Sequence, residues 1–466
     1  ESAADLVLAN AQVINVFTGE IEAGNVAIYN GMIAGVGNYH QARKVLNLAG
    51  KYLAPGLING HTHIESSMLD VGEYARAVVP RGTLAVVSDL HELANVSGLD
   101  GIRYILDSAR RLPLNLFLMA PSCVPATHLE TSGASIDEKA LRQLLRWRGV
   151  IGLGEVMNFP GVINGSAHLL NKIALAKGRV VDGHAPGVSG KDLTAYIASG
   201  IYSDHESVSL GEAGEKLRQG MYIMLREGSS EKNLTSLLPL VTDKTYKRCF
   251  FAVDDRSCAD LLKDGDIDAV VRKAISYGLE PVRAITLATI NTAEYFGLKR
   301  LGAIAPGYMA NLLVISKLSN LEIDLVFHRG RLVAKQGESL FSPKQPNSKR
   351  PASTINIKPF AIDALRLVAS AKTKPIIEVV PGQIITKKRL EKVKVAGGII
   401  LADTSRDILK LVVVERHCAS GKIGLGLVMG FGLKYGALVS SISHDSHNII
   451  AVGTNDEDIF RGIKEI

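Results

Sequence analysis

The chain has 466 residues, more than one ordinary domain holds, so we expect roughly two or three domains. Hydrophobic residues make up 47% and charged residues 21%, a balance that excludes disorder on a large scale. The formal net charge of +7 would attract polyanions, but the basic residues are scattered and aromatic residues reach only 5%, so we expect no nucleic-acid partner.

The cysteines and the hydropathy of the sequence indicate the cellular compartment of the protein. The four cysteines form no CxxC pair and no dense cluster, which favours a reducing environment. No uncharged apolar run reaches the roughly 18 residues that a membrane helix needs. The first residues, ESAAD, lack the basic segment of a signal peptide. We therefore expect a cytoplasmic protein with no membrane partner.

The first part of the chain, residues 1–53, consists of short β-like runs punctuated by glycine and asparagine, which predicts a small β domain. Over 54–301 the pattern changes to apolar runs that end in polar residues and alternate with helical stretches. This alternation is typical of a parallel sheet. We count about eight such runs, starting with Leu57–His63, which is enough to close a (β/α)8 TIM-like barrel.

After the barrel, residues 302–341 return to β patterning and are expected to join residues 1–53 in one composite β-sandwich domain flanking the barrel. Residues 342–358 are polar, basic and contain proline, which predicts a linker. Residues 359–466 alternate β-like and helical runs again and predict an additional C-terminal α/β domain, of α+β character. The predicted fold class of the whole chain is α/β.

Histidines gather where the predicted barrel strands end, the face at which such barrels carry their sites. His61 and His63 are two residues apart on one strand, so both imidazoles point to the same side. An HxH pair alone is a weak signal, and any single histidine could be a hydrogen-bonded core residue. However, His91, His184 and His205 also follow apolar runs, which disfavours that alternative for the group.

Carboxylates occupy the same position on other strands. Glu155 ends one apolar run and Asp254 follows another. Imidazoles and carboxylates that converge on one rim suit divalent zinc, iron or manganese. A carboxylate such as Glu155 can bridge two ions, which gives a binuclear site that activates a shared water.

Several segments together resemble the amidohydrolase superfamily, and within it the adenine deaminases. They are PGLINGHTHIESSM (55–68), SDLHELANVSG (88–98), PSCVPA (121–126), GLGEVMNFPGV (152–162), DGHAPG (182–187), SDHES (203–207), LREGS (225–229), DDR (254–256), IAPG (304–307), GFGLKYGA (430–437) and HDSHNIIAVGTNDED (444–458). They span almost the whole chain in the family's order. Family members continue past Ile466, so we expect this chain to be shorter than they are.

The resemblance implies a set of metal ligands. His61, His63 and Asp254 would bind one ion, His184 and His205 a second, and Glu155 would bridge the two. The family's DPHE motif corresponds to Asp89-Leu90-His91-Glu92, which would place Asp89, His91 and Glu92 beside the metals, with Asp89 and His91 as further candidate metal residues. The implied cofactors are two divalent metal ions, Mn²⁺ or Fe²⁺, with Zn²⁺ as an alternative.

The implied reaction, part of purine salvage, is hydrolytic deamination of adenine to hypoxanthine and ammonia by a metal-bridged hydroxide that attacks C6. Asp254 would accept the water's proton and pass it to the departing amine, as general base and then acid. Glu92 would protonate a ring nitrogen, and His205 would polarise the site as well as bind metal.

The residues that recognise the substrate are less well defined. Arg226 is a candidate for holding the purine edge, with a surface pairing to Glu227 as its alternative. Glu65 and Ser66 would either shape the pocket or cap the next helix.

Three other functions fit the sequence less well. A cyclic-amide hydrolase of the same superfamily would commonly bridge its metals with a carboxylated lysine, whereas this strand offers Glu155 and no lysine. A non-catalytic barrel module should have lost at least one of the six ligands, and none is lost. A nucleic-acid deaminase would carry HxE…PCxxC, which is absent.

Two features of the C-terminal region remain open. His444 and His447 could bind a further ion or cap a loop against the barrel or a neighbouring subunit. The large apolar runs of this region suggest a homodimer.

Overall fold

The computed structural model describes residues 3–343, 354–381 and 385–466. The chain divides into two compact units. The first comprises Glu1–Leu90, Arg103–Cys123 and Asp137–Lys349, and the second comprises His91–Ile102, Val124–Ile136 and Arg350–Ile466. The second unit thus includes two segments that the sequence places within the barrel region. The linker expected over 342–358 lies largely outside the described residues.

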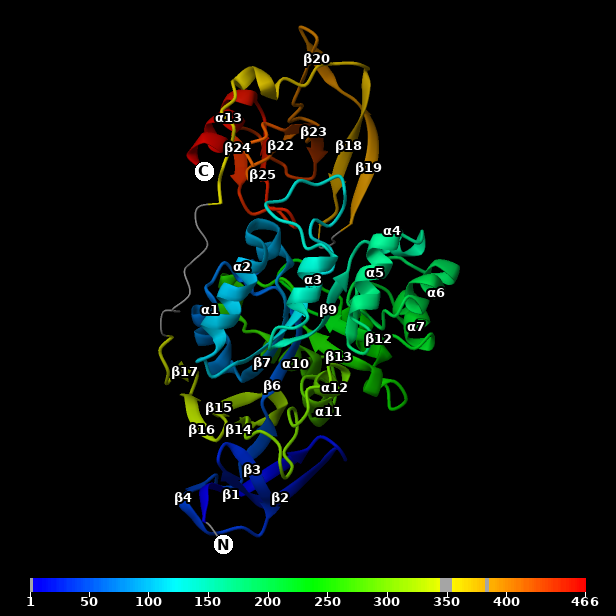
Figure 1. The fold of residues 1–466 in the computed structure, drawn as a ribbon. Coiled ribbons are helices and arrows are strands. Elements are labelled where there is room, and N and C mark those ends of the chain that lie inside the picture. The colour runs from blue at the N-terminus through cyan, green and yellow to red at the C-terminus, as the bar shows by residue number, and fades with distance from the viewer. Residues whose placement is uncertain (1–2, 344–353, 382–384) are drawn as a thin grey trace. The chain divides into compact units, whose positions relative to one another are not determined.

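Eight parallel strands form the centre of the first unit (Figure 1). They are β6 (Leu57–Thr62), β7 (Thr83–Asp89), β8 (Asn115–Ala120), β9 (Val150–Val156), β10 (Val180–Gly183), β11 (Ser203–Asp204), β12 (Tyr222–Arg226) and β13 (Cys249–Ala252). The ladder β10-β9-β8-β7-β6 meets the ladder β11-β12-β13 at both edges. Tyr202 N donates to Val181 O (3.4 Å) and Asp254 N donates to His61 O (2.9 Å). The strands therefore close into a ring, and the predicted (β/α)8 barrel is confirmed.

Helices connect these strands. They are α1 (Val71–Val78), α2 (His91–Ala109), α3 (Glu138–Leu144), α4 (Phe159–Ile163), α5 (Ala167–Leu175), α6 (Gly190–Ala198), α7 (Leu210–Arg218), α8 (Leu234–Leu237), α9 (Cys258–Lys263), α10 (Ile267–Ser276), α11 (Pro281–Leu287) and α12 (Ile290–Tyr295), with short 3-10 turns η1 (Ile64–Ser67), η2 (Val79–Arg81), η3 (Leu238–Leu240) and η4 (Tyr246–Arg248). Local side chains start several of them; for example, Ser209 accepts a hydrogen bond from Glu212 N at the start of α7. Helix α2 is broken at Gly98, whose φ of 58° is not helical.

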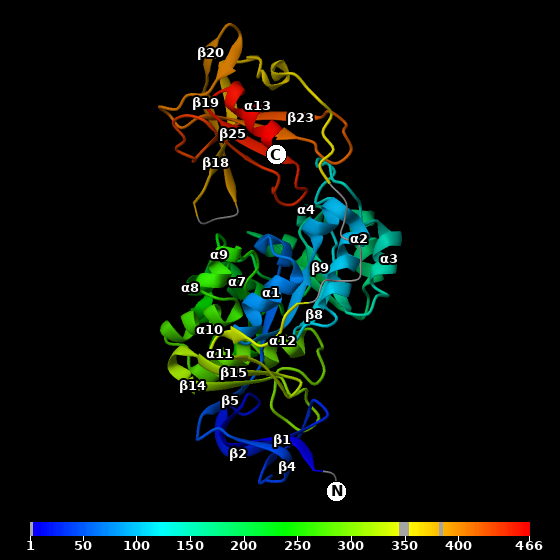
Figure 2. The same cartoon turned by 90° about the vertical axis from the view of Figure 1, so that its left-hand side faces the viewer.

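A nine-stranded sheet combines the two ends of the first unit (Figure 2). Its strands are β1 (Ala4–Asn15), β2 (Glu20–Tyr29), β3 (Met32–Gly37), β4 (Ala42–Asn47), β5 (Tyr52–Pro55), β14 (Leu312–Lys317), β15 (Glu322–His328), β16 (Arg331–Lys335) and β17 (Glu338–Ser339), with η5 (Leu318–Asn320) between β14 and β15. β5 pairs parallel with β1 and antiparallel with β14, so strands from before and after the barrel share one sheet. Residues from both ends, such as Leu53 and Val314, are buried in one hydrophobic core.

The second unit contains a six-stranded sheet in the order β19-β18-β23-β22-β25-β24. Its elements are η6 (Ile362–Leu365), β18 (Thr373–Val379), β19 (Thr386–Lys392), β20 (Lys394–Ala396), β21 (Ile399–Leu401), β22 (Leu409–Val414), β23 (Ile423–Met429), β24 (Ala437–Ser440), β25 (Ile449–Gly453) and α13 (Asp456–Glu465). All its strand pairs except β18–β23 are antiparallel. Ile459 and Ile463 of α13 pack with Val412 of β22 in its core. Within 354–381 and 385–466, α13 is the one α-helix, so strands are joined mainly to strands and the expected β/α alternation is weak.

No helix among the described residues is both long and apolar enough to span a bilayer.

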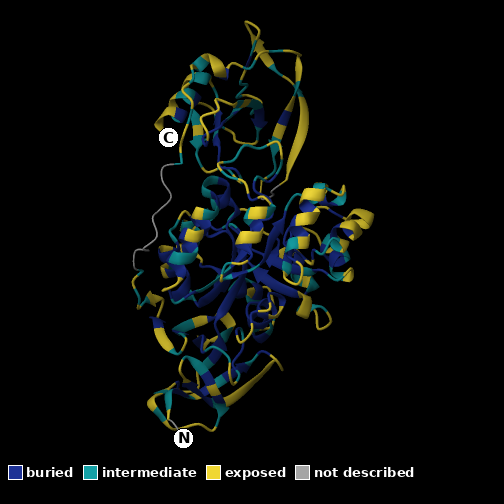
Figure 3. Ribbon diagram, in the orientation of Figure 1, coloured by how far each residue is buried: buried dark blue, intermediate teal, exposed yellow. Residues whose placement is uncertain are grey.

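The barrel strands are buried along most of their length, which demands small residues where strands approach closely (Figure 3). At Gly183, the last residue of β10, a Cβ would overlap the carbonyl oxygen of Ser203 and lie 2.8 Å from a methyl group of Ile201. The spacing between β10 and β11 therefore requires glycine at this position.

We predict that Gly183→Ala lowers the free energy of unfolding by about 1–3 kcal/mol, because a well-packed interior must shift to accept the methyl group. Gly211→Ala is the matched control: nothing lies within 4 Å of its Cβ position in α7, so alanine there should be neutral or stabilise by up to about 1 kcal/mol. Urea unfolding followed by circular dichroism measures both. Equal midpoints for the two variants would contradict this account of β10.

Candidate metal centre

Six side chains meet at the carboxyl ends of the barrel strands. They are His61 on β6, His63 directly after it, Glu155 on β9, His184 after β10, His205 after β11 and Asp254 after β13. All but the half-buried His184 are buried. The structure thus brings together residues that the sequence separates by almost 200 positions, because parallel strands of a barrel present their carboxyl ends on one face.

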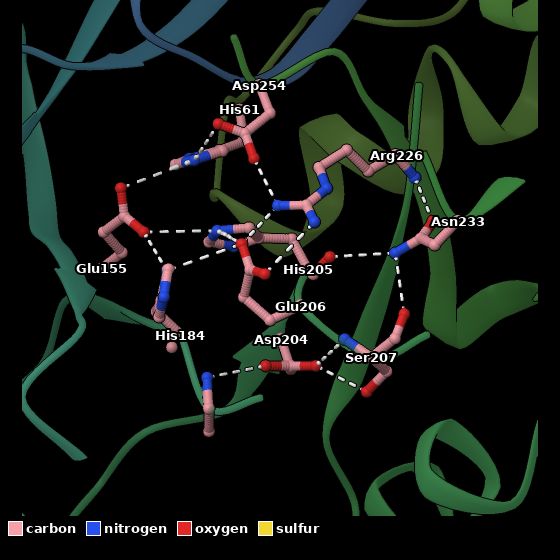
Figure 4. Close-up of polar contacts among 12 residues, drawn as sticks. His61, Glu155, His184, Asp204, His205, Glu206, Ser207, Arg226, Asn233 and Asp254 are labelled. Carbon is pink, nitrogen blue, oxygen red and sulfur yellow. Dashed lines mark hydrogen bonds and ion pairs between the residues drawn. The ribbon is translucent and has the colours of Figure 1, made fainter. Parts of the chain in front are cut away.

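Glu155 lies between two pairs of histidines, and Figure 4 labels three of these histidines, His61, His184 and His205. Its Oε1 is 3.2 Å from Nε2 of His63 and 3.8 Å from Nε2 of His61. Its Oε2 is 2.6 Å from Nδ1 of His184 and 3.2 Å from Nε2 of His205. Each carboxylate oxygen therefore faces a different histidine pair, which is the arrangement that a bridging carboxylate requires.

Asp254 completes the side of the cluster that holds His61 and His63. Its Oδ1 is 3.2 Å from His63 Nε2 and 3.8 Å from His61 Nε2. Its φ of 65° lies in the left-handed region, which is costly for a residue with a side chain. The backbone is held there because Asp254 N donates to His61 O (2.9 Å) and Thr62 Oγ1 donates to Asp254 O (2.8 Å). In this backbone conformation the carboxylate of Asp254 points toward the two histidines.

The donor set fits divalent cations. His61 Nε2 is buried and has no hydrogen-bond partner in the part of the chain that the structure describes, although carboxylate oxygens lie 3.8 Å away. A buried imidazole nitrogen without a partner is costly, whereas a metal ligand bond would satisfy it. Ligand atoms of His61, His63 and Glu155, and likewise those of Glu155, His184 and His205, lie within 4.8 Å of one another. Imidazole with carboxylate is a donor set of zinc, iron and manganese.

The pKa shifts of His61 and Glu155 keep these two residues in forms that can bind a metal ion. Burial, together with the nearby His205, lowers the pKa of His61 well below its ordinary value, which leaves its imidazole neutral. Burial would raise the pKa of Glu155, but hydrogen bonds from His184, His205 and His63 outweigh burial and hold that pKa well below its usual range. The site therefore offers an ionised carboxylate and at least one free imidazole at neutral pH.

Arg226 is buried beside the cluster (Figure 4). Its Nη1 contacts Glu206 Oε1 and Asp254 Oδ2, the latter at 2.5 Å, and its Nη2 donates to Glu206 Oε2 at 3.1 Å. The alternative of a surface pair with Glu227 is wrong, because only 2% of Arg226 is exposed and Glu227 pairs with Lys273 instead.

Glu206 is a site residue that the sequence analysis missed. Its Oε1 lies 3.2 Å from His205 Nε2 and 3.6 Å from His184 Nδ1. The available signal was its place directly after His205 in SDHES, at the end of a barrel strand.

The remaining predicted residues fall in three places. Asp89 ends β7 and its Oδ2 accepts a hydrogen bond from Glu155 N (3.1 Å), so it holds the backbone of the bridging residue. Ser66 donates to the carboxylate of Asp255, and Glu65 is its neighbour in η1. His91 and Glu92 begin α2 and belong to the second unit.

A buried ion pair supports His184 and His205, the histidines that follow β10 and β11. Lys216 Nζ donates to Asp204 Oδ2 (3.0 Å) and to Ala185 O (2.7 Å), while Asp204 Oδ1 accepts from Ala185 N (3.0 Å). Ala185 follows His184 and Asp204 precedes His205, so this pair ties the two ligand-bearing turns together. Lys216 lies on α7, where an isolated lysine gives no sequence signal of burial.

Asn233 adds a second support. Its Nδ2 donates to His205 O and Ser207 O, both at 2.9 Å, and its Oδ1 accepts from Arg226 N at 2.6 Å (Figure 4). Strand β12 and the turn after β11 are thereby held in one arrangement.

The fold and the metal-ligating rim define a metal-dependent hydrolase of the amidohydrolase class, and residues 52–333 match the amidohydrolase family. Residues 383–466 match the adenine deaminase C-terminal domain. Adenine deaminase of Dehalococcoides mccartyi is 61% identical over 466 residues, which are 100% of this chain and 82% of that protein. Adenine deaminase 2 of Carboxydothermus hydrogenoformans is 48% identical over 463 residues, 99% of this chain and 81% of that protein. The chain belongs to the adenine deaminase family, and the resemblance seen in the sequence is confirmed.

Solved structures agree on the fold. The β-aspartyl dipeptidase of Fervidobacterium islandicum AW-1 aligns with a TM-score of 0.55 at 16% identity, over 73% of this chain and 98% of that chain. The L-hydantoinase of Arthrobacter aurescens aligns with a TM-score of 0.54 at 14% identity, again over 73% and 98%. At such low identity these likenesses establish the barrel fold alone.

We predict that Lys216→Met destabilises the protein by about 3–5 kcal/mol, because it leaves Asp204 buried without its cation. The double variant Lys216→Met/Asp204→Asn should recover part of that loss, since it removes the unpaired charge. Thermal and urea unfolding of the three proteins provide the measurement. If the double variant is less stable than the single one, the ion pair does not have the role assigned to it.

Proposed function

We propose that the chain catalyses hydrolytic deamination of adenine, in which adenine and water give hypoxanthine and ammonia. The observation that carries the proposal is the position of Glu155, whose two oxygens are divided between two histidine pairs. The chain is also 61% identical over its full length to an adenine deaminase, which supports the same reaction.

The proposal includes two divalent ions. His61, His63 and Asp254 would hold one, His184 and His205 the other, and Glu155 both. When bound, such ions lower the pKa of a coordinated water from about 15.7 towards about 7 and so supply a nucleophile at neutral pH. The ligand types suit manganese, iron and zinc, and manganese or iron is the proposed identity.

Asp254 is the proposed general base and acid. Burial would raise its pKa, but Arg226 beside it and a hydrogen bond from His63 outweigh burial and hold the pKa well below its usual range. A carboxylate that is kept ionised in this way can accept a proton from an acidified water. The proton taken from the water would then be delivered to the departing amine nitrogen.

The remaining roles complete the proposal. His205 would polarise the reacting centre, and Glu92 would protonate a ring nitrogen so that negative charge does not build up on the purine as C6 becomes tetrahedral. Because both ends of the Arg226 guanidinium already contact carboxylates, its contacts support orienting Asp254 more than reading the purine edge. Glu65 and Ser66 stay candidates for shaping the pocket.

Two rival functions are less well supported. A cyclic-amide hydrolase shares the barrel, as the likeness to L-hydantoinase shows, but that likeness concerns the fold alone. In this chain the bridging position is taken by Glu155, and β9 contains no lysine to be carboxylated. A non-catalytic module is disfavoured because all six ligand side chains are present and converge.

The proposal extends to the protein's setting. A chain that acts on free adenine would serve purine salvage in the cytoplasm. We also propose a homodimer and no nucleic-acid partner, as expected from the sequence.

We predict that the purified protein releases ammonia from adenine and binds about two Mn²⁺, Fe²⁺ or Zn²⁺ ions per chain, with activity lost on chelation and restored by one of these metals. Glu155→Ala should bind at most one ion, because it removes the shared ligand. Product analysis and elemental analysis test both points. Ring opening of a hydantoin without ammonia from adenine would favour the rival hydrolase.

We predict that Asp254→Asn lowers kcat by about 10²–10⁴-fold, the usual contribution of general acid–base catalysis, while metal content stays near that of the parent. Asp243→Asn, at an exposed aspartate paired with Arg283, is the matched control and should change neither. A steady-state ammonia assay with metal analysis measures the effect. Activity of Asp254→Asn within a few-fold of the parent would remove this residue from the mechanism.

A further inference from the structure

Glu92 is held by histidines from the C-terminal part of the second unit. It lies in the first turn of α2, only 2% exposed. Its Oε1 is 3.0 Å from Nδ1 of His444, and its Oε2 is 2.9 Å from Nε2 of His447. The adjacent His91 places its Nε2 3.2 Å from Asp445 Oδ1. The HDSHN segment, which the sequence left without a role, therefore contacts the DPHE-like motif at several atoms.

A backbone hydrogen bond defines the tautomer of His447. The amide of Ser443 donates to His447 Nδ1 at 3.1 Å. Since a backbone amide can only donate, Nδ1 accepts and carries no proton. The proton of the imidazole is then on Nε2, directed at Glu92 Oε2. With its Nε2 acting as a donor, His447 is arranged to hold the Glu92 carboxyl group.

The loop that carries these histidines, between β24 and β25, is anchored on several sides. Ser446 O accepts from His417 Nε2 at 2.7 Å, and Asn448 Nδ2 donates to Thr131 O at 2.8 Å. His447 has a φ of 53°, and its amide donates to Ser443 O at 2.7 Å. A donor held this firmly loses little conformational entropy when it binds a carboxylate.

We propose that His447 and His444 are positioning residues that orient the Glu92 carboxyl group for its contact with the purine ring. The proposal rests on the proposed deaminase function and on the role given there to Glu92. One histidine contacts each oxygen of the carboxyl group, so the two contacts together fix its orientation.

The test compares amides of two lengths at each histidine. A glutamine amide nitrogen reaches about as far as Nε2, whereas an asparagine amide nitrogen reaches about as far as Nδ1. At position 447, where Nε2 makes the contact, glutamine should preserve it and asparagine should lose it. At position 444, where Nδ1 makes the contact, the order should be reversed.

With the metal-loaded full chain, we expect His447→Asn to lower kcat for adenine about 10²-fold, as expected for a misplaced catalytic group, and His447→Gln to stay within about fivefold of the parent. At position 444, Asn should retain more activity than Gln. The difference in kcat between these two variants should be smaller than at position 447, because the His444 side chain is 44% exposed. KM and bound metal should stay near the parent values. His128→Asn, at an exposed histidine of the same unit, should change nothing.

A second comparison separates positioning from a purely structural effect. In the Glu92→Gln background, His447→Asn should lower kcat no further, because the group that it orients is gone. Hydrogen exchange of residues 443–448 checks that the loop is folded in each variant. The proposal is overturned if Asn and Gln behave alike at both positions, if KM or metal content accounts for the loss, or if the effect adds to that of Glu92→Gln. A parent inactive on adenine instead overturns the proposed function, and this inference with it.

Discussion

The carboxylate of Glu155 is the interaction on which the site depends. It faces four imidazoles, and its own backbone is fixed on both sides: Asp89 accepts from its amide at 3.1 Å, and Ser122 Oγ donates to its carbonyl at 2.5 Å. The residue before it must be glycine, because a Cβ on Gly154 would overlap the Asp89 carboxylate. The GLGE motif therefore contains a glycine that close packing requires and a glutamate that the metal site requires. The glycine admits Asp89, and Asp89 orients the strand that presents Glu155.

The charges around this residue favour the binding of cations. Glu155, Glu206 and Asp254 are three buried carboxylates, and the Arg226 guanidinium contacts two of them. The carboxylates exceed this guanidinium by two, and they outweigh burial and raise the pKa values of His63, His184 and His205 beside them. Protonated histidines can offset that excess, but only by giving up the lone pairs that make them ligands. Divalent ions would offset it and would satisfy His61 Nε2 as well, in keeping with the proposed metal site.

The sequence predicted the barrel and six members of the cluster because both are encoded locally. An apolar run followed by a polar residue marks the carboxyl end of a buried parallel strand, so His184 or Asp254 can be picked out without knowing what it touches. The local sequence does not show in this way which residue a side chain will contact. Arg226 could equally have faced solvent beside Glu227, and Lys216 has the sequence context of any surface helix. The C-terminal domain shows the same limit: the short connection from Val414 to Ile423 permits an antiparallel pair, where apolar runs alone also suggested a β/α alternation.

The four-residue motif Asp89-Leu90-His91-Glu92 connects the two units through the chain itself. Its first residue secures Glu155 within the first unit, and its last is secured by His444 and His447 within the second. Helix α2, which follows, is divided in the same way, because its residues up to Ile102 belong to the second unit and those from Arg103 to the first, with the helical path broken at Gly98. Within the second unit, the contacts of Glu92 with His444 and His447 come from a segment more than 350 residues away in the sequence, so the local pattern around the motif could not reveal them.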